Sequence, residues 1–146
     1  LKNIIAIAVG MGDGLGAGDN TRAALITRGL AEVTRLGVAM GGKAPTFAGL
    51  AGMGDMIATC TSAQSRNRHV GMELAKGRTM DEIVNEMFMV AEGAKSAPAV
   101  MALAESHGVE MPIASDVYRV LVGETNARGV YRGLLRVSAG AESEPG

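Results

Sequence analysis

The sequence is poor in aromatic residues, with no tryptophan, two phenylalanines and two tyrosines among its 146 residues. It has a single cysteine, which excludes an internal disulfide framework and favours a reducing compartment, the cytoplasm. The net charge is −1, so no chain-wide basic field is present to hold nucleic acid or an anionic membrane. No window is both apolar and long enough to span a bilayer. The function classes left are those of a globular domain that handles small molecules or other proteins.

Glycine and methionine are plentiful instead, with 21 and 10 residues. With so few aromatics, the core must be built from alanine, leucine, isoleucine, valine and methionine, which favours closely approaching helices over a β-sandwich. The length fits one domain with a real core. The sequence begins at Leu1 without an initiator methionine and enters an apolar run at once. We therefore expect a fragment of a longer protein.

Helical spacing of apolar residues, divided by caps and glycines, predicts an all-α domain of about seven helices over residues 1–137. Residues 138–146 have the composition of a disordered tail. The opening residues 1–10 fit either a buried strand or a helix. In the first half of the chain, an N-cap is expected in Asp19 to Thr21 and a helix end at Gly37. Further along, a helix is expected to end at Gly77, and a capping box from Thr79 to Glu82 to start the next one. A helix is then expected after Pro98, with Val100, Leu103 and Ala104 inward and its end at Gly108, followed by an N-cap at Thr125 or Asn126.

Residues 12–17, GDGLGA, match the relaxed fingerprint of a dinucleotide-binding loop, and Glu32 stands at a tolerable distance downstream. Two features argue against such a loop. Asp13 and Asp19 would place negative charge beside a bound pyrophosphate, and the further parallel strands that the loop requires are not evident. We therefore expect a helix that ends or kinks among these glycines, followed by a close-packed turn.

Residues 49–71, GLAGMGDMIATCTSAQSRNRHVG, place one carboxylate in small apolar surroundings ahead of a cluster of hydroxyl and basic side chains. Asp55 either caps a helix that begins just after it, or pairs with a functional lysine or a substrate hydroxyl. Lys2 is either a solvated lysine or a general acid at the positive end of a helix. Spacing alone does not choose between these alternatives.

The second half of that segment is a candidate anion site. Ser65, Arg66 and Asn67 gather hydrogen-bond donors where a helix begins, which favours a phosphate over the simpler alternative of a capped, solvated helix start. The two histidines, His69 and His107, are far apart in the sequence, so no metal site is expected. The cysteine, Cys60, is expected to be a small buried residue.

Several longer motifs occur in the order LKN, GDGLGAGDN, ALITRGLAE, TFAGLAGMGDMIATCTS, SRNR and VAEG. Through them the chain resembles the bacterial NAD(P)-dependent glycerol-3-phosphate dehydrogenases over nearly its whole length. The resemblance implies the helical substrate domain of that family, similar to the C-terminal domain of 6-phosphogluconate dehydrogenase. In the family this domain follows an N-terminal Rossmann domain, which is absent from this sequence. Where the turn reads VAEG, a second β-branched residue is common in the family at Ala91.

The resemblance also implies roles for individual residues. Lys2 matches the residue that exchanges a proton with the C2 oxygen of the substrate, and Asp55 matches the aspartate that orients it. The implied substrate-binding residues are Lys2, Asn3, Asp55, Thr59, Ser65, Arg66 and Asn67, and those that touch the cofactor are Arg66, Val90 and Glu92. With NAD or NADP as cofactor, the implied reaction is the reversible reduction of dihydroxyacetone phosphate to sn-glycerol 3-phosphate for phospholipid synthesis.

Two other hypotheses stay open beside this one. The chain could be the helical domain of a β-hydroxyacid or phosphogluconate dehydrogenase, which uses a similar lysine, although the SRNR motif argues against it. It could also be a non-catalytic helical module that binds a phosphorylated ligand or another protein. If the chain is instead the substrate domain of a glycerol-3-phosphate dehydrogenase, its partners are the small substrate, the protein's own Rossmann domain and, as a further candidate, a second copy in a homodimer. The fragment alone is then expected to be inactive.

Overall fold

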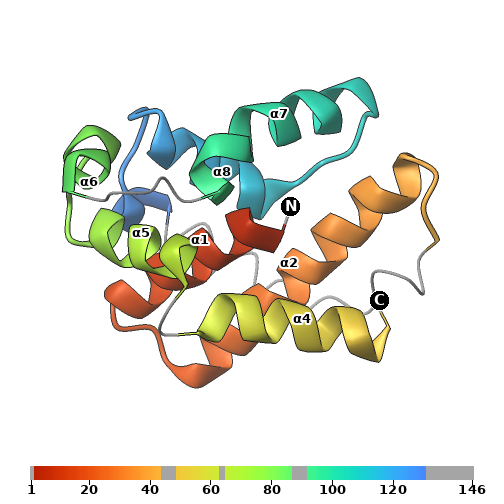
Figure 1. Ribbon diagram of the computed structural model, residues 1–146, viewed down its shortest axis with the longest axis horizontal. Coiled ribbons are helices and arrows are strands. Elements are labelled where there is room, and N and C mark those ends of the chain that lie inside the picture. The colour runs from red at the N-terminus through yellow and green to blue at the C-terminus, as the bar shows by residue number, and fades with distance from the viewer. Residues whose placement is uncertain (1, 44–48, 63–64, 87–91, 131–146) are drawn as a thin grey trace.

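The computed structural model describes residues 2–43, 49–62, 65–86 and 92–130. These residues form helices and connecting turns, which confirms the all-α prediction for this part of the chain (Figure 1). None of the helices described is long and apolar enough to cross a membrane. The helices are α1 (Lys2–Gly14), α2 (Asp19–Ala39), α4 (Leu50–Thr61), α5 (Arg66–Ala75), α6 (Met80–Glu86), α7 (Glu92–Ser106) and α8 (Pro112–Leu121), with a further helical turn at 127–130.

Helix α1 is the centre of the fold and packs against α2, α4, α5, α7 and α8. Figure 1 shows it in the middle of the molecule, between α7 and α4. Every residue from Ile4 to Gly12 is buried. A helix that is apolar on all sides is stable only when other elements surround it, and here they do. The opening residues are therefore a helix, and the alternative of a buried strand is wrong.

Glycines bring α1 and α5 into direct backbone contact. A Cβ on Gly10 would overlap with the carbonyl oxygen of Arg68, and a Cβ on Gly71 would overlap with that of Ile7. Each glycine therefore removes the side chain that would hold the two helices apart. The glycine-rich stretch of the sequence serves helix packing, and it places the start of α5 firmly against α1.

The end of α1 is held by a buried carboxylate. Asp13, whose side chain is 5% exposed, accepts hydrogen bonds from Nε of Arg22 on α2 at 2.9 Å and from Nε of Arg68 on α5 at 3.0 Å. A buried charge is tolerated only with such partners. The helix ends at Gly14, and Gly16, with φ of +83°, makes the turn. The predicted helix end among these glycines is confirmed, and residues 12–17 are not arranged as a nucleotide loop.

Two predictions for α2 are wrong. The helix begins at Asp19, and the capping position is Gly18, which has no side chain to accept a hydrogen bond. It also continues through Gly37 to Ala39. Gly37 is buried beside the fully buried Leu36, so packing against the core outweighs the tendency of glycine to end a helix.

Glu32 on α2 is a charged residue that is buried in the fold. Glutamate is rarely buried in proteins, yet Glu32 is only 1% exposed. Its carboxylate accepts the backbone N–H groups of Ile113 at 2.9 Å and Ala114 at 3.2 Å, the first free donors of α8. Burial raises the pKa of Glu32, and the two N–H groups oppose that rise. Glu32 therefore caps α8 from a distant helix.

The caps predicted for the second half of the chain are confirmed. Gly77, with φ of +89°, ends the turn after α5. Thr79 and Glu82 form the capping box, since each backbone N–H donates to the side chain of the other at 3.3 Å. Asn126 accepts the N–H of Gly129 at 2.8 Å. These signals are local, so they can be recognised without knowledge of the fold.

The prediction for α7 is right about its end and wrong about its start. Gly108, with φ of +63°, follows the helix as expected. The helix begins at Glu92, however, and contains Pro98 within it. Leu103, expected to face inward, is 36% exposed, whereas Val100 and Ala104 are buried.

Glu73 on α5 is held by two cations. Its carboxylate, 11% exposed, accepts from Nζ of Lys76 at 2.9 Å and from a terminal nitrogen of Arg78 at 3.0 Å. These hydrogen bonds, with that from Lys76 the larger cause, hold the pKa of Glu73 below its usual value. The carboxylate therefore contributes to folding in its charged form.

Replacing Glu73 by glutamine should destabilise the chain by about 1 kcal/mol at pH 7. A carboxylate with a lowered pKa in the folded state stabilises the fold above its unfolded pKa, and this is lost as pH falls through the folded value. The difference between wild type and Glu73→Gln in urea unfolding should therefore be full at pH 7 and vanish in acid. Glu105→Gln, at an exposed position on α7, is the matched control and should have little effect at either pH. A Glu73→Gln penalty that persists unchanged in acid contradicts this account.

Candidate active site

Lys2 and Asp55 form an ion pair that joins the first turn of α1 to the middle of α4. Nζ of Lys2 lies 2.6 Å from Oδ2 of Asp55. The two side chains are 43% and 58% exposed, so solvent screening makes the pair a minor contributor to stability. Helix capping by Asp55 is wrong because α4 already begins at Leu50. Pairing with a lysine, the other alternative for Asp55, is confirmed, and it leaves an oriented ammonium group accessible from outside.

Two further residues of α4 lie close to Asp55 in the sequence. Thr59 follows Asp55 by one helical turn, which places both on the same face, and it is half-buried. Cys60 is fully buried, with its sulfur 3.7 Å from that of Met56. Burial, together with the charge of Asp13, raises the pKa of the Cys60 thiol to about 12. The prediction of a small buried cysteine is confirmed, and the thiol stays protonated at neutral pH.

The start of α5 has the features of an anion site. Oγ of Ser65, the N-cap residue, accepts the N–H of Arg68 at 3.2 Å, and the Ser65 carbonyl accepts that of His69 at 3.1 Å. Within the described residues, the backbone N–H groups of Arg66 and Asn67 have no hydrogen-bond partner, and the exposed Arg66 side chain has no ion pair. Free N–H groups and the helix dipole favour a bound anion at this end.

Three helix starts meet at Gly93. Its N–H, in the first turn of α7, donates to Oδ1 of the buried Asn67 at 2.8 Å. A Cβ at Gly93 would lie 2.7 Å from the carbonyl oxygen of Asn3, the second residue of α1. Asn3 follows Lys2, and Asn67 follows Arg66, so the ion pair and the anion site lie at the same end of the fold.

The structure therefore brings together most of the candidate residues, in two groups. Lys2 contacts Asp55, while Asn3 and Asn67 meet through Gly93. Ser65 and Arg66 precede Asn67 at the start of α5. Thr59 lies one turn beyond Asp55 on α4. Of the other two candidates, Val90 lies outside the described residues, and so does the side chain of Glu92, the first residue of α7.

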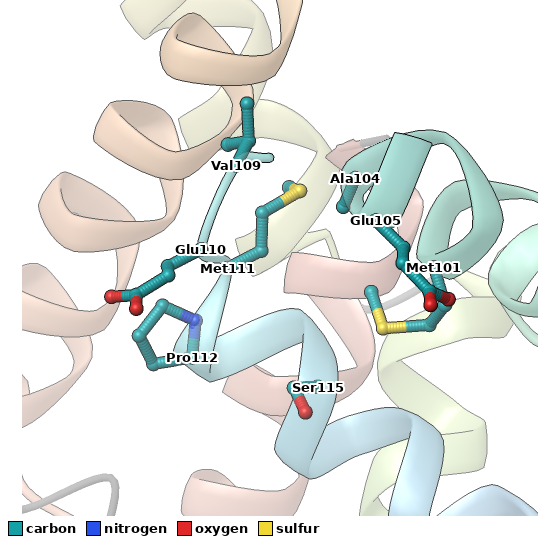
Figure 2. Close-up of a pocket in the computed structure, with 8 residues that line it drawn as sticks. All are labelled: Met101, Ala104, Glu105, Val109, Glu110, Met111, Pro112 and Ser115. Carbon is teal, nitrogen blue, oxygen red and sulfur yellow. The ribbon is translucent and has the colours of Figure 1, made fainter. Parts of the chain in front are cut away.

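A hollow of about 380 Å³ lies elsewhere, between the end of α7 and the start of α8 (Figure 2). Figure 2 shows Glu105 and Glu110 on opposite sides of it, with methionine side chains between them. None of the candidate residues lines this hollow. Its lining is Met101, Ala104, Glu105, Val109, Glu110, Met111, Pro112 and Ser115. The candidate residues whose side chains are described lie at the starts of α1 and α5 and on α4, and none of them is in this hollow.

Comparison with known proteins places these features in a family. Residues 1–132 match the sequence family described as the C-terminus of NAD-dependent glycerol-3-phosphate dehydrogenase. The chain belongs to this family. It is 71% identical over 146 residues to glycerol-3-phosphate dehydrogenase [NAD(P)+] 2 of Sphingopyxis alaskensis, covering all of this chain and 44% of the relative. It is 56% identical over 142 residues to the enzyme of Citrifermentans bemidjiense, covering 97% of this chain and 42% of the relative.

Solved structures of glycerol-3-phosphate dehydrogenases have the same fold. The crystal structure from Coxiella burnetii superposes with a TM-score of 0.87 at 45% identity, covering 92% of this chain and 42% of that one. The structure from Dunaliella salina superposes with a TM-score of 0.77 at 26% identity, covering 99% of this chain and 26% of that one. The chain thus spans less than half the length of these glycerol-3-phosphate dehydrogenases. The family expected from the sequence motifs is confirmed.

Sequence reasoning missed two residues that connect helices around the candidate site, Gly93 and Asp13. Gly93 stands inside the VAEG motif, but its hydrogen bond reaches Asn67, 26 residues away. Asp13 was recognised only as an obstacle to nucleotide binding, whereas it ties α1 to α5 through Arg68. The one sequence signal for Asp13 was its position, since a carboxylate in a glycine-rich apolar stretch needs a cationic partner.

Proposed function

We propose that this chain is the substrate-binding and catalytic part of an NAD(P)-dependent glycerol-3-phosphate dehydrogenase, which interconverts dihydroxyacetone phosphate and sn-glycerol 3-phosphate. The ion pair of Lys2 and Asp55, with 2.6 Å between Nζ and Oδ2, is the observation that carries the proposal. Reduction of a phosphorylated ketone needs a proton donor for the ketone oxygen and a partner for the phosphate. An oriented, exposed ammonium group and an anion-binding helix start at the same end of the domain meet both needs.

Lys2 has two tasks in this proposal. As the C2 carbonyl of the substrate becomes an alkoxide, the ammonium group stabilises the growing negative charge and donates a proton to the oxygen. Asp55 keeps Nζ aimed at that oxygen through the ion pair. In the reverse direction the neutral amine of Lys2 accepts the hydroxyl proton of sn-glycerol 3-phosphate.

The start of α5 would hold the phosphate. The N–H groups of Arg66 and Asn67 and the hydroxyl of Ser65 donate to its oxygens, and the guanidinium of Arg66 binds two of them at once, which lysine could not do. We also assign Asn3 and Thr59 to the substrate site, on the two helices that carry Lys2 and Asp55. Binding the remote phosphate fixes the position of the reacting carbon, which lowers the entropic cost of reaction.

NAD or NADP, when bound, supplies the hydride. The exposed guanidinium of Arg66 suits an anionic cofactor as well as the substrate, and we assign Val90 and Glu92 to the same contact. The described residues offer no phosphate loop for the dinucleotide, because Asp13 in the glycine-rich stretch is paired with Arg22 and Arg68. We infer that most of the cofactor is bound by a Rossmann domain that precedes this one in the whole protein.

A chimera tests the proposal. In it, this chain replaces the matching segment of the Sphingopyxis alaskensis relative, and NAD(P)H oxidation is followed by absorbance with dihydroxyacetone phosphate as substrate. We expect a rate within about tenfold of that of the relative itself. A small misplacement of the catalytic groups that raises the activation free energy by about 1.4 kcal/mol lowers the rate tenfold. The control omits dihydroxyacetone phosphate. A folded chimera, judged by circular dichroism and gel filtration, that oxidises no cofactor rejects the proposal.

Three finer predictions accompany the proposed function. We propose a cytoplasmic location, which suits the single cysteine. A homodimer remains a prediction. The domain end at residue 137 and the disordered tail at 138–146 also remain predictions, because they fall outside the described residues.

A further inference from the structure

Gly93 occupies a position that only glycine fits. A Cβ there would lie 2.7 Å from the carbonyl oxygen of Asn3 and 2.8 Å from Oδ1 of Asn67, both closer than real Cβ atoms come. The first obstacle is backbone, which cannot swing away. The absence of a side chain lets the first turn of α7 settle against α1 and α5 together.

The hydrogen bond from Gly93 determines which way the carboxamide of Asn67 faces. A backbone N–H can only donate, so the atom opposite Gly93 must be the side-chain oxygen. The amide nitrogen then faces away from Gly93. Within the described residues no hydrogen bond uses that nitrogen, and no side-chain polar atom there is both buried and without a partner. The amide nitrogen therefore keeps contact with solvent, although Asn67 is only 8% exposed.

The free side of this carboxamide is close to the proposed anion site, because Asn67 is the second residue of α5. Helical side chains lean toward the N-terminus of their helix, so the amide group of Asn67 lies toward the start of α5. There the N–H groups of Arg66 and Asn67 have no partner within the residues described. The amide nitrogen adds two more donors for an anionic oxygen.

We propose that Gly93 is a positioning residue of the substrate site, which acts by turning the carboxamide of Asn67 so that its NH₂ group, and not its oxygen, faces the substrate phosphate. The inference rests on the proposed function, because it takes the anion to be the phosphate of dihydroxyacetone phosphate. Gly93 itself touches neither substrate nor reacting atoms. Through this single hydrogen bond, the start of α7 controls a donor at the start of α5.

A double-mutant cycle in the chimera tests whether Gly93 acts through Asn67. Gly93→Ala should raise KM for dihydroxyacetone phosphate about tenfold and change kcat less than threefold. In an Asn67→Ala background the clash with Oδ1 is gone and only the clash with the Asn3 backbone remains, so the same change should raise KM clearly less, by about threefold at most. Gly12→Ala is the matched control, because a Cβ at that buried helical glycine meets only ordinary contacts, at 3.5 Å or more. An equal effect of Gly93→Ala in both backgrounds overturns the inference, since Gly93 is then a packing residue only.

Asn67→Asp tests the NH₂ group of Asn67 separately from its side-chain oxygen. This variant remains informative if the Gly93→Ala protein does not fold. A carboxylate keeps an oxygen for the N–H of Gly93 but replaces the NH₂ donors with a second, charged acceptor. We expect a KM for dihydroxyacetone phosphate at least tenfold higher and a melting temperature within about 3 °C of wild type. Asn85→Asp makes the same charge change at an exposed position on α6 and should leave KM unchanged. A wild-type KM for Asn67→Asp overturns the inference.

Hydrogen exchange provides a measurement that does not depend on turnover. In the 146-residue chain, the amide of Gly93 should exchange at least tenfold more slowly than in the Asn67→Ala variant, and equal rates overturn the inference. The failures of the two proposals are distinguishable. An inactive unmodified chimera rejects the proposed function, whereas an active chimera that is indifferent to Asn67→Asp and Gly93→Ala rejects only the role of Gly93.

Discussion

Replacing Lys2 by alanine in the chimera should lower kcat for reduction of dihydroxyacetone phosphate by about 10²–10⁴-fold, the usual contribution of a positioned general acid. The ammonium group of Lys2 is accessible and held 2.6 Å from Asp55, so removing it deletes the proton donor and the cation that would stabilise the alkoxide. Because the ion pair is 43% and 58% exposed, its loss should lower the melting temperature by no more than about 2 °C. A large kinetic loss without loss of stability distinguishes a catalytic lysine from a structural one.

Two further variants complete this test. Lys2→Arg keeps a positive charge beside Asp55 but cannot release its proton, so it should be nearly as slow as Lys2→Ala. Lys95→Ala removes an exposed lysine near the start of α7 and should retain full activity. Initial rates with saturating cofactor measure all three. Retention of more than about a tenth of kcat by Lys2→Ala contradicts the role proposed for Lys2.

Gly71→Ala should destabilise the domain by about 3 kcal/mol, which corresponds to a fall of roughly 10 °C in melting temperature. The new Cβ would overlap with the carbonyl oxygen of Ile7 and lie 2.7 Å from the backbone nitrogen of Met11. Neither obstacle is a flexible side chain, so α5 must move away from α1. Because α5 begins with Ser65, Arg66 and Asn67, the same displacement should weaken phosphate binding. Thermal unfolding measures the first effect and KM the second.

Gly54→Ala is the matched control for Gly71→Ala. Gly54 also lies within a helix, α4, but a Cβ there meets nothing within 4 Å. Alanine forms helices better than glycine, so Gly54→Ala should stabilise the chain by up to about 1 kcal/mol. The same chemical change should thus have opposite signs at the two positions. Similar effects at both would show that the contact between α1 and α5 is looser than described.

Local chemistry was enough to predict much of the helical architecture. The Thr79–Glu82 capping box and the glycine stops at Gly77 and Gly108 depend on neighbours within a few residues, so the pattern contains all the necessary information. Of the candidate site, the helix start at Ser65 was predictable for the same reason. The pairing of Asp55 could be stated only as one of two alternatives.

Three features that the sequence did not reveal depend on long-range contacts. Glu32 looks like a surface residue until the start of α8, some eighty positions later in the chain, is placed beside it. Gly37 looks like a helix end because local propensity cannot register the core packed against it. Gly93 looks like an ordinary turn glycine because Asn3 and Asn67 approach it only in the folded chain. In each case tertiary packing outweighed a weak local preference.

The burial of α1 on every side also bears on how the domain folds. This helix precedes all its partners in the chain, and two of them, α5 and α8, are far along it. Forming those contacts requires closure of long loops, which raises the contact order and slows folding for an otherwise helical protein. Until α8 is available, part of the apolar stretch of α1, residues 4–12, stays exposed. The early collapsed chain is therefore the stage most prone to aggregation, and the one where help from a chaperone would matter most.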